Sequence, residues 1–378
     1  MSIQSVVRCE SYDQSVMNET VARHFEALKV AELLSPGTRA LIKPNLIAAR
    51  KPESAATTHP ALIRAVALWL RERGVESIAL ADSPGGLYTP SILETVYAAS
   101  GMKALGDVVE LNRDTGFQTR ACPPDFENAS FNLINPVCQA DLIIDIAKLK
   151  THSMTRLSAG VKNLFGCIPG LQKPELHYKH PNIAGFSNML IELAKLVAPQ
   201  VTLIDAVDCM EGDGPTGGTV RRLGLTLASR DVFAQDWFAA TLMGIDPESV
   251  GMLARAKARG WLDPDAIELT GDAPVYADPP FILPETTSVD FTGFLPAFLR
   301  APARKALGRL LKPLPKVDPK KCVGCGRCAE SCPAHIIRIE NHKAKFTAKG
   351  CISCFCCQEM CPAHAISVKR IFGGRTSG

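Results

Sequence analysis

The chain has 378 residues, enough for one large domain and a small one, and its 42 lysines and arginines against 38 acidic residues give a net charge of +4. The first residues, MSIQSVVRCESYDQ, lack the basic and apolar regions of a secretion signal, and the most apolar helical stretch, residues 61–70, is short and contains Arg64. These features predict neither a secreted nor a membrane-spanning protein. The fourteen cysteines then indicate a reducing cytoplasm, because disulfides persist in oxidising compartments.

Short apolar runs alternate with capped helices over residues 1–290, a pattern typical of a mostly parallel sheet flanked by helices. Helices are predicted at residues 60–73, 90–100, 232–243 and 247–259, since each starts at or after Pro, Thr or Asp and stops before a glycine. We therefore expect one large α/β domain over these 290 residues. Its predicted strands are Ala40–Lys43, Ser77–Ala81, Leu142–Lys148, Val201–Asp205 and Leu223–Ala228.

Polar side chains directly follow several of these strands. In open α/β sheets, ligands bind at the carboxyl ends of the strands, where the following loops gather. We therefore expect a crevice at that edge, with lysines on one wall and carboxylates on the other. The lysines are Lys43, Lys148, Lys150 and Lys162, and the carboxylates are Asp82, Asp205 and Glu211.

Such a crevice suits an anionic small molecule. Lys148, Lys150 and Lys162 would hold a carboxylate or phosphate, and His152 or Asp82 would transfer protons. The alternative is that these lysines are ordinary loop charges and the nearby glycines ordinary turns. The sequence leaves both interpretations open.

One glycine-rich stretch, residues 212–217, fits the G-x-G-x-x-G pattern of dinucleotide-binding loops. That pattern needs a following helix, whose N-terminus holds the pyrophosphate. Here residues 220–228 read as a strand, and Glu211 and Asp213 would repel phosphate. A nicotinamide site is therefore not expected.

Two histidines follow in a segment bounded by prolines. His177 and His180 lie three residues apart near Glu175, and together they could bind a metal ion. Histidines in such a segment are more often exposed. We therefore predict that both lie at the surface.

A basic, amphipathic stretch, residues 291–316, is predicted to link the large domain to the tail. Eight lysines and arginines lie between Phe298 and Lys321, against Asp318 alone. Such a linker could contact an anionic membrane surface or an acidic redox partner. The favoured alternative is a helix that packs its apolar side on the large domain. Nucleic acid is not expected, because no aromatic side chains alternate with the basic ones.

The tail, residues 317–378, contains two copies of C-x₂-C-x₂-C-x₃-C-P separated by 29 residues. This is the ligand pattern for two 4Fe–4S clusters of the bacterial ferredoxin type, in which the fourth cysteine of each copy binds the cluster of the other copy. The repeat continues beyond the cysteines into two short alternating strands. The predicted ligands are Cys322, Cys325, Cys328 and Cys361 for cluster one, and Cys351, Cys354, Cys357 and Cys332 for cluster two.

Other uses of these cysteines fit less well. Zinc sites usually take two separated pairs of ligands, and disulfides do not suit a chain without a secretion signal. Cys356 aligns with Arg327 of the first copy and is predicted to have no ligand role. A small α+β domain of the ferredoxin type is therefore expected, held together largely by its metal centres.

Several segments of the large domain resemble a family catalogued as domain of unknown function 362. The resemblance covers most of residues 1–280, and many members of that family carry a C-terminal two-cluster ferredoxin module. It implies an α/β domain coupled to iron–sulfur electron transfer, without an agreed reaction. The segments are IKPNL at 42–46, ADSPGG at 81–86, KLKTHSMTRLSAGVKNLFGCIPG at 148–170, LIDAVDCMEGDGPTGG at 203–218 and LASRDVFAQDWFAATLMG at 227–244.

Two functions remain open from the sequence. The first is an iron–sulfur oxidoreductase that relays single electrons between a redox partner protein and a ligand in the crevice, favoured because the fusion raises the local concentration of the clusters. The second is a non-enzymatic electron carrier or maturation factor that docks a partner. A weaker third hypothesis makes the clusters structural or sensory parts of a non-redox enzyme.

Overall fold

The computed structural model describes residues 1–284 and 314–369. In these ranges a nine-stranded sheet runs in the order β11-β1-β10-β9-β7-β2-β3-β4, and β8 pairs with β7 outside that path. Pairings among β2, β3, β4, β7 and β9 are parallel, whereas β10 runs antiparallel to both of its neighbours. The strands are β1 (Ser2–Arg8), β2 (Arg39–Pro44), β3 (Ser77–Leu80), β4 (Glu110–Leu111), β7 (Leu142–His152), β8 (Arg156–Ser158), β9 (Val201–Glu211), β10 (Thr219–Ser229) and β11 (Ile267–Gly271).

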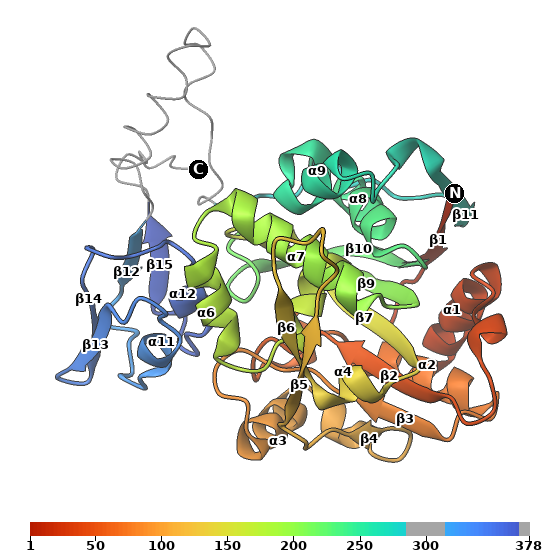
Figure 1. The fold of residues 1–378 in the computed structure, drawn as a ribbon, viewed down its shortest axis with the longest axis horizontal. Coiled ribbons are helices and arrows are strands. Elements are labelled where there is room, and N and C mark those ends of the chain that lie inside the picture. Colours follow the sequence, from red (N-terminus) through yellow and green to blue (C-terminus); the bar gives the residue numbers. More distant parts are fainter. Residues whose placement is uncertain (285–313, 370–378) are drawn as a thin grey trace, which may run out of the picture.

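Helices cover both faces of this sheet, so the domain has two apolar cores (Figure 1). On one face lie α1 (Gln14–Ala27), α2 (Pro60–Arg71) and α3 (Pro90–Ala99). On the other face lie α4 (Asn135–Gln139), α5 (Gly160–Asn163), α6 (Gln172–Lys179), α7 (Ile183–Val197), α8 (Val232–Leu242) and α9 (Gly251–Ala258). A hairpin of β5 (Phe117–Ala121) and β6 (Ser130–Ile134) adds to this second face.

The helix boundaries follow from local capping. Pro60 occupies the first turn of α2, where a missing N–H costs nothing, and Gly74 adopts φ +80° after the helix ends. Asp231 accepts hydrogen bonds from two backbone N–H groups at the start of α8. The predicted helix over residues 247–259 instead divides at Val250 into a short 3₁₀ turn and α9.

The small domain has two antiparallel pairs and two helical turns. Its strands are β12 (Leu314–Val317), β13 (Ile337–Glu340), β14 (Lys343–Phe346) and β15 (Ile366–Lys369), and its helices are α11 (Arg327–Glu330) and α12 (Cys356–Glu359). The two strands expected after the cysteine repeats correspond to β13 and β15. Ile337 and Ile366 are both buried in the core of this domain.

The structure confirms an α/β fold with a mostly parallel sheet plus a small cysteine-rich domain. Strands β7 and β9 each extend to 11 residues, beyond the predicted ends at Lys148 and Asp205. The predicted basic linker falls mostly outside the described residues, and its last positions, 314–316, belong to β12. Among the helices that the structure describes, none is both long enough and apolar enough to cross a bilayer.

Candidate functional site

The carboxyl ends of four parallel strands meet at one edge of the sheet, and polar side chains gather there. Lys43 near the end of β2 lies opposite Asp145 of β7, and Lys148 of β7 lies opposite Asp205 of β9. Asp82 follows β3. All five side chains are buried, so each charge needs a partner inside the protein.

Two buried ion pairs involve four of the residues predicted for the crevice. Lys43 Nζ lies 2.9 Å from Asp82 Oδ1. Burial lowers the pKa of Lys43, but attraction to Asp82 and its neighbours outweighs burial and the pKa is raised. Lys148 Nζ lies 2.9 Å from Asp205 Oδ2 and 2.8 Å from the Tyr12 hydroxyl. The first pair joins the ends of the neighbouring strands β2 and β3, and the second joins β7 to β9.

Lys150 is the third buried lysine, and its ammonium binds neutral oxygens. Its Nζ donates to Asn45 Oδ1 at 2.5 Å and to the Ala56 carbonyl at 2.7 Å. Asn45 donates to Asn163 Oδ1, and Asn163 donates to Asp145, so a chain of hydrogen bonds connects the loop after β2 with α5 and β7. Burial lowers the pKa of Lys150 to about 7.

Strand β8 returns the chain along β7 and leads into α5. The carboxylate of Asp236 in α8 accepts hydrogen bonds from the backbone N–H groups of Gly160 at 2.7 Å and Val161 at 2.9 Å. These contacts fix the start of α5, and burial raises the pKa of Asp236 to about 7. Lys162 follows, and its Nζ lies 4.6 Å from the centre of the Phe165 ring, a cation–π contact.

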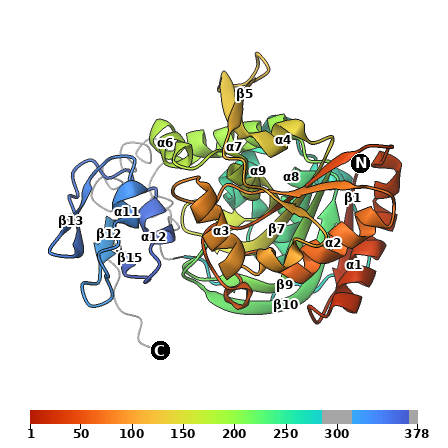
Figure 2. The same cartoon turned by 90° about the horizontal axis from the view of Figure 1, so that it is seen from below.

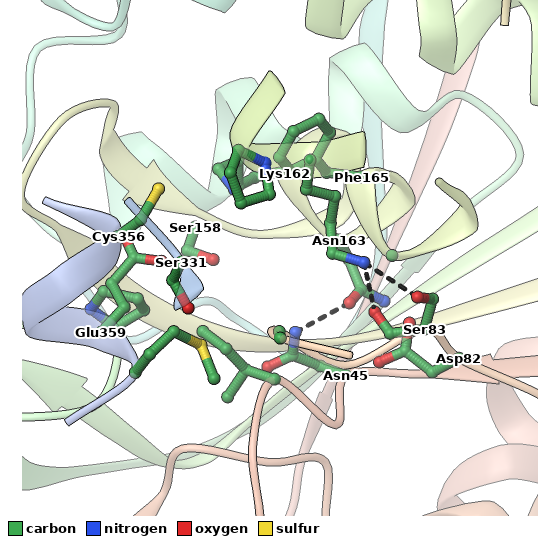
Figure 3. Close-up of a pocket in the computed structure, with 18 of the residues that line it drawn as sticks. Asn45, Asp82, Ser83, Ser158, Lys162, Asn163, Phe165, Ser331, Cys356 and Glu359 are labelled. Carbon is green, nitrogen blue, oxygen red and sulfur yellow. Dashed lines mark hydrogen bonds between the residues drawn. The ribbon is translucent and has the colours of Figure 1, made fainter. Parts of the chain in front are cut away.

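A cavity of about 80 Å³ lies between the large domain and the small one (Figure 3). Figure 3 shows Lys162 and Phe165 on the large-domain side, with Cys356 and Glu359 facing them from α12. This space is called the interdomain cavity below. Its lining includes Asn45, Asp82, Ser83, Gly85, His152, Ser158, Lys162, Asn163, Phe165, Lys173, His177, Pro215, Ser331, Cys356, Glu359 and Met360.

Two polar atoms of residues in the cavity wall have no hydrogen-bond partner among the described residues. They are His152 Nε2 and Glu359 Oε1, 3.4 Å apart. The other ring nitrogen, His152 Nδ1, accepts a hydrogen bond from the Met154 N–H at 3.0 Å. Burial holds the pKa of His152 well below its ordinary value, so the ring is neutral.

Two more side chains from α6 reach the cavity. Lys173 Nζ donates to the Ser83 carbonyl, the Ser83 hydroxyl and the Ile168 carbonyl at 2.8–2.9 Å, and burial lowers its pKa to about 7. His177 is 3% exposed and stacks on Phe186 with ring centres 4.1 Å apart. The predicted surface position is therefore wrong for His177, because α6 packs that side of the helix on the core.

His180, the other histidine of that segment, is half-buried. Its Nε2 lies 3.1 Å from Asn128 Oδ1, within hydrogen-bond distance. The proline of the segment, Pro174, occupies the first turn of α6, where a helix tolerates it. Residues 172–179 therefore form a helix and not the proline-bounded loop that the sequence suggests.

Helix α12 lies on the side of the small domain that faces the large one (Figure 2), and a glycine of the large domain allows the residue after α12 to approach closely. A Cβ at Gly85 would lie 2.2 Å from Met360 Sδ. Arg50 Nη2 donates to the Cys361 carbonyl at 3.1 Å, and the Thr216 hydroxyl donates to the Glu359 carbonyl at 3.2 Å. Residues 212–217, which fit the G-x-G-x-x-G pattern, connect β9 to β10. The strand predicted after this pattern is β10.

Two further cavities, each of about 20 Å³, lie inside the small domain. Each is surrounded by four cysteines, three from one motif and the fourth from the other, which fits the thiolate set of a 4Fe–4S cluster. Within the described residues, no three His, Cys, Asp or Glu are arranged for a single metal ion. One cavity is lined by Cys322, Cys325, Cys328 and Cys361, and the other by Cys332, Cys351, Cys354 and Cys357.

The structure brings only some of the predicted catalytic residues together. Asp82, His152 and Lys162 line the interdomain cavity, whereas Lys148 and Lys150 lie outside its lining. Each of those lysines binds two protein oxygens. Glu211 lies farther along β9, where it pairs with an arginine of β10 at 3.0 Å.

Four titratable residues of the lining were not predicted as site residues from the sequence. Lys173 and His177 belong to α6, a helix that the prediction lacked. Cys356 and Glu359 belong to α12. The signal for Cys356 was its departure from the repeat, since the first copy has Arg327 at that position.

Comparison with known proteins agrees with this division. Residues 40–241 match the family described as domain of unknown function (DUF362), and residues 314–362 match the 4Fe-4S dicluster domain. The thylakoid-associated protein sll1697 of Synechocystis sp. is 33% identical over 271 residues, which cover 70% of this chain and 82% of that protein.

Two solved structures show a weaker likeness. The lactate racemase apoprotein from Thermoanaerobacterium thermosaccharolyticum has a TM-score of 0.36 and 15% identity, covering 54% of this chain and 50% of that one. A protein from Thermotoga maritima has a TM-score of 0.36 and 12% identity, covering 52% of this chain and 51% of that one. The chain thus spans about half the length of each of these two proteins. Because of the family match and the 33% identity to the Synechocystis protein, the chain belongs to the DUF362 family, and it carries a 4Fe–4S dicluster domain.

Proposed function

We propose that this protein is an iron–sulfur oxidoreductase that relays single electrons between a redox partner protein and a small anionic ligand in the interdomain cavity. One observation carries the proposal. The cavity that contains Lys162 and His152 is closed by Ser331 and Cys356. Ser331 precedes Cys332, and Cys356 lies between Cys354 and Cys357, so cysteines of one predicted cluster lie directly behind the cavity wall.

The proposal includes two clusters held in crossed fashion. Cluster one takes Cys322, Cys325, Cys328 and Cys361, and cluster two takes Cys332, Cys351, Cys354 and Cys357. In support, each four-cysteine set surrounds its own cavity. When bound, such clusters supply single-electron transfer.

The side chains of the large domain then have separate roles. Lys162 holds the anionic group of the ligand, and His152 donates a hydrogen bond to it from Nε2. Lys148, Lys150 and Asp82 act as positioning residues, because their hydrogen bonds go to Tyr12, Ala56 and Lys43 within the large domain. These roles differ because the polar atoms of Lys148, Lys150 and Asp82 already have hydrogen-bond partners in the protein, whereas His152 Nε2 has none among the described residues.

The partner is proposed to dock where cluster one reaches the surface. Cys325 is exposed, and Val323 beside it is 66% exposed. Lys320, Lys321 and Arg327 surround this loop and are exposed, so an acidic partner fits it. This face lies within the described residues, unlike most of the basic linker. The proposed location of the protein is the cytoplasm.

A comparison of two lysine variants tests the proposal. Anaerobic protein is reduced with dithionite, and its reoxidation by a panel of short 2-oxo acids, which accept two electrons and two protons to give 2-hydroxy acids, is followed by visible absorbance. We expect Lys162→Ala to slow ligand-dependent reoxidation at least tenfold while iron content and unfolding temperature stay unchanged. Lys148→Ala should instead lower stability by about 3–5 kcal/mol, because Asp205 is left buried without its cation.

The opposite results would favour a different function. If no compound in the panel changes the reoxidation rate, and the protein still passes electrons to an acidic carrier, the non-enzymatic carrier hypothesis replaces this one. If Lys162→Ala reoxidises as fast as the unchanged protein with every active compound, Lys162 does not hold the ligand.

A further inference from the structure

One arginine of the large domain reaches the backbone of a proposed cluster ligand in the small domain. Arg50 lies in the loop after β2, and its Nη2 donates a hydrogen bond to the Cys361 carbonyl at 3.1 Å. Its Nη1 donates to the Pro362 carbonyl at 3.4 Å. Cys361 is the fourth ligand proposed for cluster one. The guanidinium is therefore bound to the segment that carries this ligand.

The positive charge of Arg50 is not neutralised by a carboxylate within the described residues. The charged groups that act on it are Cys361 and Arg327, and its buried Nε has no hydrogen-bond partner in the described part of the chain. Burial is the main cause that lowers the pKa of Arg50, but a guanidinium stays protonated in proteins. A fixed cation therefore stands beside Cys361.

The cysteine repeat provides an internal comparison for this contact. Cys332 is the equivalent of Cys361, 29 residues earlier, and it is the fourth ligand proposed for cluster two. Each of the two carbonyls accepts a backbone hydrogen bond, from His335 and His364 respectively. Only the Cys361 carbonyl also accepts from an arginine or lysine side chain among the residues that the structure describes. The large domain thus treats the two cluster sites unequally.

The other donors near cluster one come from the small domain itself. The Cys361 sulfur accepts from the Ala365 N–H at 3.2 Å, and the Cys322 sulfur accepts from the Ala344 N–H at 3.4 Å. Hydrogen bonds to the sulfurs, nearby charge and solvent exposure set the reduction potential of such clusters. The contribution of Arg50 differs from these, because it depends on the large domain being docked.

The charge of Arg50 has a direct consequence for reduction. When a cluster takes up one electron, its net charge becomes more negative by one unit, so a nearby cation favours the reduced form. Salt screens a partly buried cation less than an exposed one. Resting on the clusters of the proposed function, we propose that Arg50 raises the reduction potential of cluster one, so that docking of the large domain tunes the cluster that faces the partner protein.

A redox titration of the anaerobic full chain tests this proposal without ligand or partner. Dithionite supplies one electron to each cluster and is itself oxidised, and electron paramagnetic resonance follows the two clusters. Val323→Glu identifies cluster one, because Val323 lines its cavity and is 66% exposed, so a negative charge there should lower that potential.

The decisive variant removes the charge of Arg50. We expect Arg50→Gln to lower the equilibrium constant for reduction of cluster one about tenfold, which is about 59 mV for one electron. The potential of cluster two should change much less. Arg50→Lys keeps the charge and should recover most of the loss. This recovery would distinguish an effect of charge from an effect of the lost hydrogen bonds.

Two control variants separate the charge from docking and from net charge. Thr216→Val removes a neutral hydrogen bond between the domains, from the Thr216 hydroxyl to the Glu359 carbonyl. Arg71→Gln removes an arginine that donates to the Val108 carbonyl from α2, which Figure 1 shows apart from the small domain. Both variants should leave both potentials unchanged.

Several results would overturn the inference. They are an unchanged cluster-one potential in Arg50→Gln, an equal fall of both potentials, a fall in the potential that Val323→Glu leaves unchanged, and an equal fall in either control variant. If Arg50→Gln loses its iron, Arg50→Met takes its place. Loss of iron from both would show that Arg50 retains the cluster and does not tune it, which also overturns the inference.

The titration also separates this inference from the proposed function. A lowered potential in Arg50→Gln, without reoxidation of the unchanged protein by any 2-oxo acid, leaves the inference standing and contradicts the oxidoreductase proposal. Reoxidation by a 2-oxo acid together with an unchanged potential does the reverse. An unchanged chain without iron would contradict the clusters and therefore both.

Discussion

The buried pair of Lys43 and Asp82 depends on a glycine above it. A Cβ at Gly166 would lie 1.9 Å from Asp82 Oδ1 and 2.9 Å from Lys43 Nζ. The other oxygen, Asp82 Oδ2, accepts a hydrogen bond from the Leu46 N–H at 2.8 Å, so the carboxylate has no room to move aside. The glycine is therefore required by space and not by backbone conformation.

We expect Gly166→Ala to lower stability by about 3 kcal/mol or more, because it separates a buried ion pair. Thermal unfolding of the anaerobic protein measures the effect. Gly106→Ala is the matched control, since a Cβ there meets its nearest atom at 3.7 Å. An unchanged unfolding temperature in Gly166→Ala would contradict the described packing.

Distant pairing explains which site residues the sequence could identify. Asp82, His152 and Lys162, which the sequence analysis assigned to the crevice, line the interdomain cavity. The partners of Lys43 and Lys148 lie 39 and 57 residues away in sequence, and nothing local shows that these lysines are neutralised. Local sequence patterns therefore predict which edge of the sheet is polar. They do not predict which charged side chains at that edge are neutralised by a distant partner.

The two cysteine repeats place similar short helices in unequal surroundings. Glu330 of α11 and Glu359 of α12 occupy equivalent positions 29 residues apart, yet Glu330 is exposed while Glu359 lies against the large domain. The residue before each helix has positive φ: Gly326 at +81° and Phe355 at +62°. Phenylalanine is strained in that conformation, and its burial at 5% exposure in the apolar cluster of the large domain offsets the strain.

We expect Phe355→Gly to retain its iron but to loosen the small domain from the large one. Glycine relieves about 1 kcal/mol of strain, whereas removing a buried phenylalanine costs about 3 kcal/mol or more. Hydrogen–deuterium exchange should therefore rise in residues 356–362 and in the facing loop at 47–52.

Gly326→Ala is the control for backbone strain. It introduces a side chain at the equivalent position of the first repeat, where a Cβ meets no atom within 4 Å. It should destabilise the small domain slightly and leave exchange at 47–52 unchanged. Equal exchange at 47–52 in Phe355→Gly and the unchanged protein would show that this ring does not hold the domains together.

Secondary structure was the most predictable part of the fold, because caps, glycine stops and apolar runs are local. The strands after the cysteine repeats were found from the continuation of the repeat and from its alternating apolar and polar residues. Helix α6 escaped prediction because its eight residues include a proline and few apolar positions. The cavity wall formed by α12 could not be predicted, because it depends on docking between distant parts of the chain.

The two four-cysteine cavities differ in their access to solvent. The set containing Cys325 opens to the surface, while the set containing Cys357 lies next to the cavity wall and the large domain. Residues 314–369 contain nine lysines and arginines against four acidic residues, one of which, Glu359, is turned inward. The whole protein thus has a basic face at one end of the proposed electron path and the interdomain cavity at the other.

Reversing charge on that face should weaken electron exchange with an acidic carrier. With flavodoxin as the probe, Lys320→Glu combined with Lys321→Glu should slow reduction at least tenfold at about 0.01 M salt, and the difference should shrink at about 0.5 M salt. Stopped-flow absorbance measures both rates. Lys29→Glu combined with Lys179→Glu, an equal change on exposed lysines elsewhere, should have little effect. Similar slowing by both pairs would indicate a general effect of net charge.

Helix α12 has a consequence for how the protein responds to air. Its four residues include Cys357 of one four-cysteine set together with Cys356 and Glu359 of the cavity wall, and Cys361 of the other set follows two positions later. A small domain of this kind owes its shape to its metal centres. Oxidative destruction of the iron sites would therefore remove one wall of the interdomain cavity in the same event, so a damaged molecule would lose the proposed ligand site together with the proposed electron transfer.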